Sequence, residues 1–322
     1  MGACPIYQFT DLPKEITMIP SMDFLIKDEQ VYSGAQSCRG CGWSLLVRHL
    51  ADILGPETVY VVPASCFSII AGSYPMNELK ANIVHTLFAA SSATATGVRA
   101  ALDREGKQGA TVVVLAGDGG TFDIGLQALS GAAARGENIL YIVNNNGAYM
   151  NTGIQTSTAT PYGAVTTTNP GANYKKSWPK DLMGIVAAHN LPYAATASLS
   201  FMEDFRKKIL KAKNTQGFRL LMIDGPCPPG HKYEPSQSIE IGRLAVETKL
   251  FPLFEVVRQC YKITYWPAKN IPVSDCLKHQ GRFKSLFRPE NKPLLDDVQT
   301  HTDETWSRLV KMEKVERMEL VG

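Results

Sequence analysis

Residues 111–151, TVVVLAGDGGTFDIGLQALSGAAARGENILYIVNNNGAYMN, decide the fold that we expect for this chain of 322 residues. An apolar run from Thr111 to Ala116 ends in a glycine-rich turn, and a second apolar run from Asn138 to Val143 ends in asparagines. The segment between them is typical of a helix, and the unit has the ~30 residues that a parallel strand–helix–strand crossover needs. The pattern therefore predicts two parallel strands that lie side by side.

The two strand ends carry polar and glycine residues that predict an anion site. Because neighbouring parallel strands end at the same edge of a sheet, Asp118 and Asn146 should face one crevice. Gly117, Gly119 and Gly120 let the backbone approach a phosphate, and the helix that follows turns its positive end toward it. A lone carboxylate would repel a diphosphate, but carboxylate, amide and phosphate oxygens together form a site for Mg²⁺. The sequence therefore predicts a diphosphate bridged by a metal ion.

Three interpretations of this segment compete. The first is a buried crossover with a glycine-rich turn and no ligand. The second is a Rossmann dinucleotide site, but Phe122 stands where a third glycine is needed, and asparagines replace the acidic residue that would bind a ribose. The third is the thiamine diphosphate motif, in which Gly-Asp-Gly is followed just under ~30 residues later by Asn.

The longer string GDGGTFDIG…AYMNTGIQTSTATPYG resembles the β subunits of the 2-oxoacid:ferredoxin oxidoreductases. The resemblance implies thiamine diphosphate as the cofactor, which serves as an electron sink when a 2-oxoacid loses CO₂. It also implies that Asp118, the Asn146 side chain and the Ala148 carbonyl bind Mg²⁺, and that Gly119 and Gly120 offer backbone donors to the phosphates.

Two further residues of this string are candidate site residues. The resemblance implies that Asn151 is the catalytic residue that hydrogen-bonds the substrate at the reacting carbon, although an asparagine at this place can also merely stabilise a turn. Thr152 is a candidate for support of the bound cofactor.

Four cysteines predict an iron–sulfur cluster. Cys38 and Cys41 form CRGCG, a spacing that fits zinc, a redox disulfide or a cluster. Cys66 and Cys227 each follow an apolar run, so both could lie at the sheet edge that carries Gly117. Four thiolates from separate loops at this edge suit a [4Fe–4S] cluster better than a remote zinc site. The resemblance implies the same cluster, because the order and context of these cysteines match the family's cluster ligands.

The resemblance also implies partner subunits. In this family the glutamate that activates the aminopyrimidine of the cofactor belongs to a separate pyrimidine-binding domain. This chain resembles only the diphosphate-binding half, so we expect an α-type subunit to complete the active site. The eight-cysteine pattern of ferredoxin-like domains is absent, so a further subunit or domain should carry the distal clusters and pass electrons to ferredoxin.

The substrate expected first is oxalate, which would yield two CO₂, and pyruvate with coenzyme A is the alternative. Arg39 within the CxxC, Ala89 and Ala90 depart from the pyruvate-type pattern. Gly147 replaces an acidic residue, and the loss of a carboxylate beside the site lowers the repulsion of a doubly charged substrate. An alternative from another class is a non-redox thiamine enzyme, or a binding subunit whose cysteines hold structural zinc.

Composition excludes several other functions. A net charge of +3 spread over 33 basic and 30 acidic residues leaves no electrostatic footprint for nucleic acid or for a membrane surface. The first residues, MGACPIYQFTDLPKEITM, do not resemble a signal peptide, and no apolar stretch approaches the ~20 residues that span a bilayer. We therefore expect a cytoplasmic protein.

The pattern of apolar residues predicts an α/β fold, a parallel sheet with helices on both faces. We expect an irregular lead-in at 1–37, a domain at 38–227 that binds thiamine diphosphate and the cluster, and an extended tail with short helices at 228–322 that wraps partner subunits. The long loop 147–180 should be functional, because loops of this length are uncommon in compact domains. Strands are expected at 58–62, 111–116, 138–143, 193–197 and 218–223, and helices at 42–54, 87–102, 181–189 and 202–213.

Overall fold

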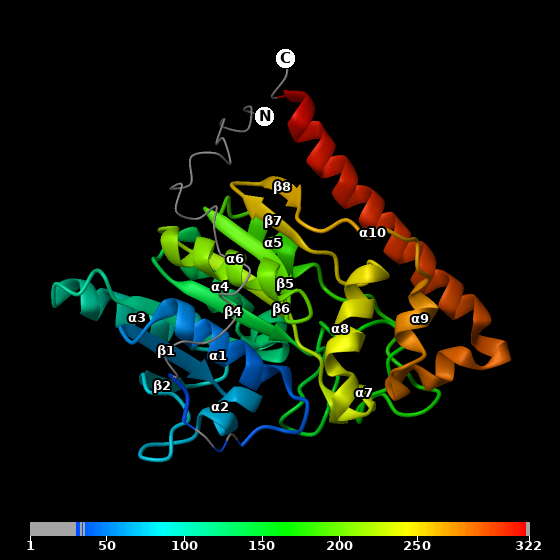
Figure 1. Cartoon of the computed structure of the whole chain (residues 1–322), viewed down its shortest axis with the longest axis horizontal. Helices are drawn as coiled ribbons and strands as arrows, with labels where there is room; N and C mark the ends of the chain where they lie inside the picture. Colours follow the sequence, from blue (N-terminus) through cyan, green and yellow to red (C-terminus); the bar gives the residue numbers. More distant parts are fainter. Residues whose placement is uncertain (1–29, 33, 35, 320–322) are drawn as a thin grey trace.

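The computed structural model describes residues 30–32, 34 and 36–319, and within them one sheet of eight strands forms the centre (Figure 1). The strands follow the order β2-β1-β3-β4-β6-β5-β7-β8. The parallel strands are β1 (Thr58–Pro63), β2 (Asn82–Thr86), β3 (Thr111–Gly117), β4 (Leu140–Asn145), β5 (Tyr193–Ser198) and β6 (Arg219–Asp224). The two antiparallel strands are β7 (Phe254–Val257) and β8 (Cys260–Ile263). The expected parallel sheet is confirmed.

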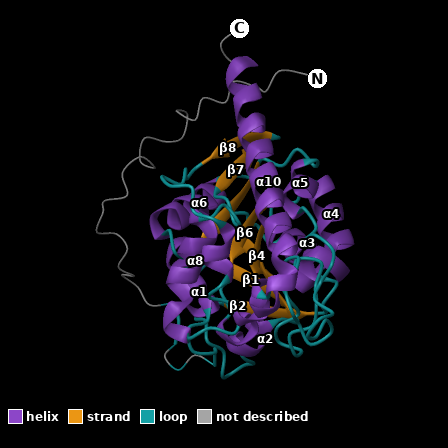
Figure 2. Ribbon diagram, turned by 90° about the vertical axis from the view of Figure 1, so that its right-hand side faces the viewer, coloured by secondary structure: helices purple, strands orange, loops and turns teal. Residues whose placement is uncertain are grey.

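Helices cover both faces of this sheet (Figure 2). One face carries α1 (Gly42–Leu54), α6 (Met202–Asn214) and α8 (Ser238–Glu247), and the other carries α3 (Ser91–Arg104), α4 (Leu126–Ala134) and α5 (Leu182–Ala187). Successive side chains of a strand point to opposite faces, so each strand supplies both cores. In β3, Val113 and Leu115 belong to the core under α1 and α6, whereas Val112 and Val114 belong to the core under α3 and α4.

The crossover that the sequence predicts is β3–α4–β4. Parallel pairing sets Gly117 opposite Asn144, so the residues that follow the two strands leave the sheet side by side. A short π-helix, Gly119–Ile124, connects β3 to α4. Single π-helical turns of this kind are frequent at functional sites.

Several elements were not expected from the sequence. The short helix α2 (Cys66–Ala71) starts at one of the four cysteines of the predicted cluster, and β2 was missed because it is short and partly exposed. The small-residue helix expected at 87–102 begins later, at Ser91. Its first residues instead form a turn, in which the Ala90 amide donates to the Leu87 carbonyl.

The region after residue 228 is more ordered than the expected tail of short helices. Strands β7 and β8 extend the sheet beyond β5, and α10 (Lys292–Glu319) is a helix of 28 residues that packs along β8 (Figure 1). The remaining elements are α7 (Pro228–His231), α9 (Val273–Leu277) and 3₁₀ turns at Pro235–Gln237, Gly281–Phe287 and Pro289–Asn291. Contact of this region with partner subunits stays a prediction.

Two expectations concern the ends and the membrane. The lead-in at 1–37 lies almost entirely outside the described residues; within them, Val31 forms an antiparallel bridge with Leu79. Of the helices in the described part, none combines the length and the apolar character that crossing a membrane requires.

The buried strand β3 should be essential to stability. Leu115 is fully buried in the core that β3 shares with α1 and α6. Leu115→Ala should lower the free energy of unfolding by about 2–5 kcal/mol, through lost transfer energy and a residual cavity. Denaturant unfolding of the purified chain measures this loss. Leu87, which is 78% exposed, provides the matched control, and Leu87→Ala should change stability by less than about 0.5 kcal/mol. Equal losses in both variants would contradict the placement of β3 in the core.

Candidate active site

The carboxyl ends of four neighbouring strands form the edge where the sequence places its chemistry. Cys66 follows β1, Asp118 follows β3, Asn146 follows β4 and Cys227 follows β6, and these strands are adjacent in the sheet. Helix α1 precedes β1 and runs back across the sheet, so its first turn, next to Cys41, lies at the same edge. Topology alone therefore gathers residues from five distant segments.

Three oxygen-bearing groups converge where β3 and β4 end. The terminal amide group of Asn146 lies 2.9 Å from Asp118 Oδ1 and 3.0 Å from the Ala148 carbonyl oxygen. The backbone amide of Asn146 also donates to Asp118 Oδ1 at 3.3 Å. These are the three groups that the family resemblance implies as ligands of Mg²⁺.

The orientation of the Asn146 amide depends on what lies between these groups. With its nitrogen turned inward, the amide donates to both oxygens. With its oxygen turned inward, three oxygens face one another, and a cation between them would offset their repulsion. An octahedral Mg²⁺ binds oxygens at about 2.1 Å, which places adjacent ligands ~3 Å apart. The observed separations fit that spacing, so these residues are suited to hold Mg²⁺.

Asp118 is buried at the centre of the site, with 1% of its surface exposed. Burial raises the pKa of its carboxyl group to about 7, although the Ser157 hydroxyl, which donates to Oδ2 at 2.6 Å, acts in the opposite direction. A carboxylate in such an environment is costly unless a cation accompanies it. A cation at this site would therefore stabilise the ionised form of Asp118.

Close packing of two aromatic rings also favours glycine at positions 119 and 120. A Cβ atom at Gly119 would lie 2.5 Å from the ring of Tyr149, and one at Gly120 would lie 3.3 Å from the ring of Phe88. Both rings therefore pack directly on the backbone of the π-helical turn. Tyr149 is fixed there by its hydroxyl, which donates to Asp123 Oδ2 at 2.7 Å. Gly117 is not crowded, since the atom nearest to a Cβ at this position would be the Ser65 Cβ, at 3.8 Å.

Asn151 and Thr152 lie on the exposed surface just beyond the buried site. The Thr152 hydroxyl donates to Gln155 Oε1 at 2.7 Å, which ties the two ends of this turn together. Asn151 is exposed to solvent, three residues after Ala148.

The four cysteines of the predicted cluster are free thiols at this edge. Burial raises the pKa of Cys41 to about 11 and that of Cys66 to about 12, and the thiols of Cys38 and Cys227 add to both shifts as electrostatic neighbours. Neutral thiols become thiolates when a metal or a cluster binds. In the described part of the chain, no three His, Cys, Asp or Glu side chains already stand close enough to hold a single metal ion.

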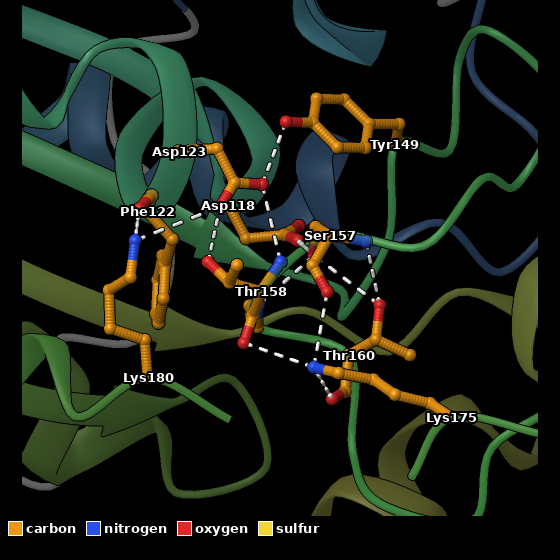
Figure 3. Close-up of polar contacts among 10 residues, drawn as sticks. Asp118, Phe122, Asp123, Tyr149, Ser157, Thr158, Thr160, Lys175 and Lys180 are labelled. Atoms are coloured by element: carbon orange, nitrogen blue, oxygen red, sulfur yellow. Dashed lines mark hydrogen bonds and ion pairs between the residues drawn. The ribbon is translucent and has the colours of Figure 1, made fainter. Parts of the chain in front are cut away.

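The structure adds polar residues that the sequence did not reveal. Ser157 and Thr160, in the long loop, donate to Asp118 and to the Gly147 carbonyl, the latter at 2.7 Å. His231 lies within 2.7 Å of the Asn146 carbonyl through Nε2, and burial lowers its pKa well below the ordinary value. These residues surround the loop after β4 (Figure 3 shows Ser157 and Thr160). No local motif marks them, because they act across large sequence separations.

Comparisons with known proteins agree with this geometry. Residues 64–223 match the family described as thiamine pyrophosphate enzyme, C-terminal TPP binding domain. The chain is 42% identical over 315 residues to the ketoisovalerate oxidoreductase subunit VorB of Pyrococcus furiosus, covering 95% of this chain and 99% of the relative. It is also 42% identical to the pyruvate synthase subunit PorB of Methanothermobacter thermautotrophicus, over 84% of this chain and 96% of the relative. The chain belongs to the β subunits of the 2-oxoacid:ferredoxin oxidoreductases.

A solved structure supports the fold of this β subunit. The 2-oxoglutarate:ferredoxin oxidoreductase from Magnetococcus marinus superimposes with a TM-score of 0.56 at 22% identity, over 69% of this chain and 81% of the other. At this identity the likeness concerns the fold alone.

The expectation of oxalate as the first substrate is not supported, and the pyruvate alternative fits the relatives better. The structure gives a different reason for glycine at position 147. Gly147 has φ of 72°, a conformation that glycine adopts without steric cost. A Cβ atom there would lie 3.2 Å from both Pro161 and Arg282 Nη1. The glycine therefore has a backbone reason and carries no information about substrate charge.

The pKa of Asp118 predicts how the metal-free β subunit depends on pH. The folded-state pKa of about 7 lies above the ordinary 3.8, so the stability that this group contributes is present below pH 3.8 and is lost as pH rises to about 7. In urea unfolding with a chelator, the free energy of unfolding should therefore decline less between pH 4 and pH 8 in Asp118→Asn than in the wild type. The exposed Asp297→Asn is the control and should decline as the wild type does. A parallel decline in Asp118→Asn would contradict the buried carboxyl.

Proposed function

We propose that this β subunit binds thiamine diphosphate through Mg²⁺ and takes part in the oxidative decarboxylation of a 2-oxoacid, with ferredoxin as electron acceptor. The observation that carries the proposal is the convergence of Asp118, Asn146 and Ala148 at the ends of β3 and β4, with separations of 2.9 and 3.0 Å. Pyruvate with coenzyme A, yielding acetyl-CoA and CO₂, is the first substrate to test. Ketoisovalerate is the second, because the relative named ketoisovalerate oxidoreductase subunit VorB matches 95% of this chain.

The metal-binding role is assigned to three groups of the chain. Asp118 Oδ1, the Asn146 side-chain oxygen and the Ala148 carbonyl would hold Mg²⁺, and the Ser157 hydroxyl would keep the free carboxylate oxygen in place. When bound, thiamine diphosphate supplies the electron sink for decarboxylation. The amides of Gly119 and Gly120, at the start of the π-helical turn, would face its phosphates, while Gly117 keeps the strand end open.

The exposed rim of the site points to a shared active site. Asn151 is the residue that we assign to the substrate, as a hydrogen-bond donor or acceptor at the reacting carbon, with Thr152 holding the turn around it. Because Asn151 is exposed in this chain, a partner must cover it for water to be excluded. An α-type subunit would cover Asn151 and would also contribute the pyrimidine-side glutamate.

The cysteines are assigned to electron transfer. Cys38, Cys41, Cys66 and Cys227 are free thiols that gather at the cofactor edge, which fits one [4Fe–4S] cluster. Cys38 is close enough to raise the pKa of each of the other three. When bound, such a cluster supplies a one-electron acceptor beside the cofactor site. A ferredoxin-like subunit or domain would then carry electrons onward to ferredoxin.

Iron content tests the cluster. Anaerobically purified chain should contain about four iron and four sulfide per chain, as one [4Fe–4S] cluster requires. Cys227→Ser should lose most of this iron. Cys276→Ser is the matched control, since Cys276 is a free, buried cysteine outside the group of four, and it should keep the full content. Zinc in place of iron would instead support the binding subunit with a structural zinc site.

Dye reduction by the assembled complex tests the substrate. Reduction of a viologen dye should be faster by at least ~10-fold with pyruvate or ketoisovalerate plus coenzyme A than with oxalate, the margin that 1.4 kcal/mol of discrimination gives. The isolated β subunit serves as the control and should show no turnover, because its active site is incomplete. Turnover by the isolated chain would contradict the shared site, and preference for oxalate would overturn the substrate assignment.

A further inference from the structure

A buried lysine lies behind the candidate magnesium site. Lys175 belongs to the long loop after β4, and only 6% of it is exposed. Its backbone is fixed on both sides: its amide donates to the Ala164 carbonyl at 3.0 Å, and its carbonyl accepts from the Gly163 amide at 2.9 Å. The side chain is therefore held in one place rather than free to reach solvent.

The ammonium group of Lys175 donates to three backbone carbonyls of one turn. The distances from Nζ are 2.6 Å to the Thr160 oxygen and 3.2 Å to each of the Ser157 and Thr158 oxygens. Figure 3 shows the nitrogen where these contacts meet. Three carbonyls that converge on a buried point repel one another unless a cation lies between them. Lys175 thus helps to hold the turn 157–160, together with the Thr160 amide, which donates to the Ser157 carbonyl at 3.2 Å.

The turn 157–160 also holds the groups around the candidate metal site. The Ser157 hydroxyl donates to Asp118 Oδ2 at 2.6 Å, and the Thr160 hydroxyl donates to the Gly147 carbonyl at 2.7 Å. Thr158 contributes a third link, since its amide donates to Asp123 Oδ2 at 3.2 Å. Asp118 is one candidate metal ligand, and Gly147 lies between the other two. A shift of the turn therefore shifts the metal-binding groups.

Charge supports the same arrangement. Burial lowers the pKa of Lys175 to about 8, and Asp123 and Asp118 counteract this as electrostatic neighbours. The ammonium group and the two acidic groups are therefore close enough to stabilise one another's charged forms across the turn that separates them.

We propose that Lys175 is a positioning residue for the magnesium site, which it maintains through the turn 157–160 without touching the metal. The proposal rests on the proposed function, because it concerns the same Mg²⁺ and thiamine diphosphate. Residues that orient metal ligands from outside typically contribute about 10- to 100-fold to metal affinity. Lys175 acts through one intervening turn, so an effect near the lower end, about 10-fold, is expected.

The test measures how much Mg²⁺ the assembled complex needs to retain thiamine diphosphate in equilibrium dialysis. Lys175→Met should raise the half-saturating Mg²⁺ concentration about 10-fold, and excess Mg²⁺ should restore retention. Lys175→Arg keeps the charge but not the compact ammonium, so it should give a smaller rise. Lys176→Met is the matched control, because Lys176 is the exposed neighbour, and it should behave as the wild type does.

A double-mutant cycle separates positioning from general damage. Ser157→Ala should also raise the half-saturating Mg²⁺ concentration. Lys175→Met combined with Ser157→Ala should be no worse than the more severe single variant, because both break one chain of contacts. Additive losses, or a Lys175→Met value within about twofold of Lys176→Met, would overturn the proposal. Should Lys175→Met not assemble, Lys175→Arg and Ser157→Ala decide by the same criteria.

Failure of the proposed function would give a different pattern. If wild-type complex retains thiamine diphosphate independently of Mg²⁺, or if Asp118→Asn retains it as the wild type does, the metal assignment itself is wrong. If Asp118→Asn abolishes retention while Lys175→Met leaves it unchanged, the metal assignment stands and the role of Lys175 is refuted.

Discussion

The parallel pairing of β3 with β4 is the constraint on which the rest of the site depends. Its register sets Gly117 opposite Asn144, so Asp118 and the loop that begins at Asn146 leave the sheet at neighbouring points. Polar groups at such a strand end cannot be paired by the sheet itself, and they need partners from elsewhere. The π-helical turn, the long loop and the region after β6 all supply those partners, which is why segments far apart in sequence meet here.

Buried acidic groups whose ionisation is unfavourable are the common property of this edge. Asp118 is a buried carboxyl whose pKa is raised by burial, and the thiols of Cys41 and Cys66 are kept neutral by the same effect. Each becomes favourable in its ionised form when a cation lies beside it. Metal and cluster would therefore contribute folding stability as well as chemistry, and the open rim at Asn151 leaves the remaining coverage to another subunit.

Much of the sheet could be predicted because its strands carry local signals. The apolar runs before Asp118 and Asn144 are bounded by glycines and asparagines, and the predicted strands 111–116 and 138–143 agree with Thr111–Gly117 and Leu140–Asn145 to within two residues. By contrast, β7 and β8 have four residues each, too few for a period to be recognised. The expectation of oxalate failed because Gly147 was interpreted as a missing charge, although its positive φ is a backbone conformation that favours glycine.

The sequence by itself determined the crossover, the parallel sheet and the residues that match the family's diphosphate and cysteine motifs, because each is encoded within a short stretch of chain. Only the tertiary structure decided which groups surround them. The contacts of Lys175 with the turn 157–160, of His231 with the Asn146 carbonyl and of Tyr149 with Gly119 depend on how the long loop and the region after residue 228 fold back onto the sheet edge. Such contacts join residues by packing rather than by spacing, so no periodicity or motif in the sequence announces them.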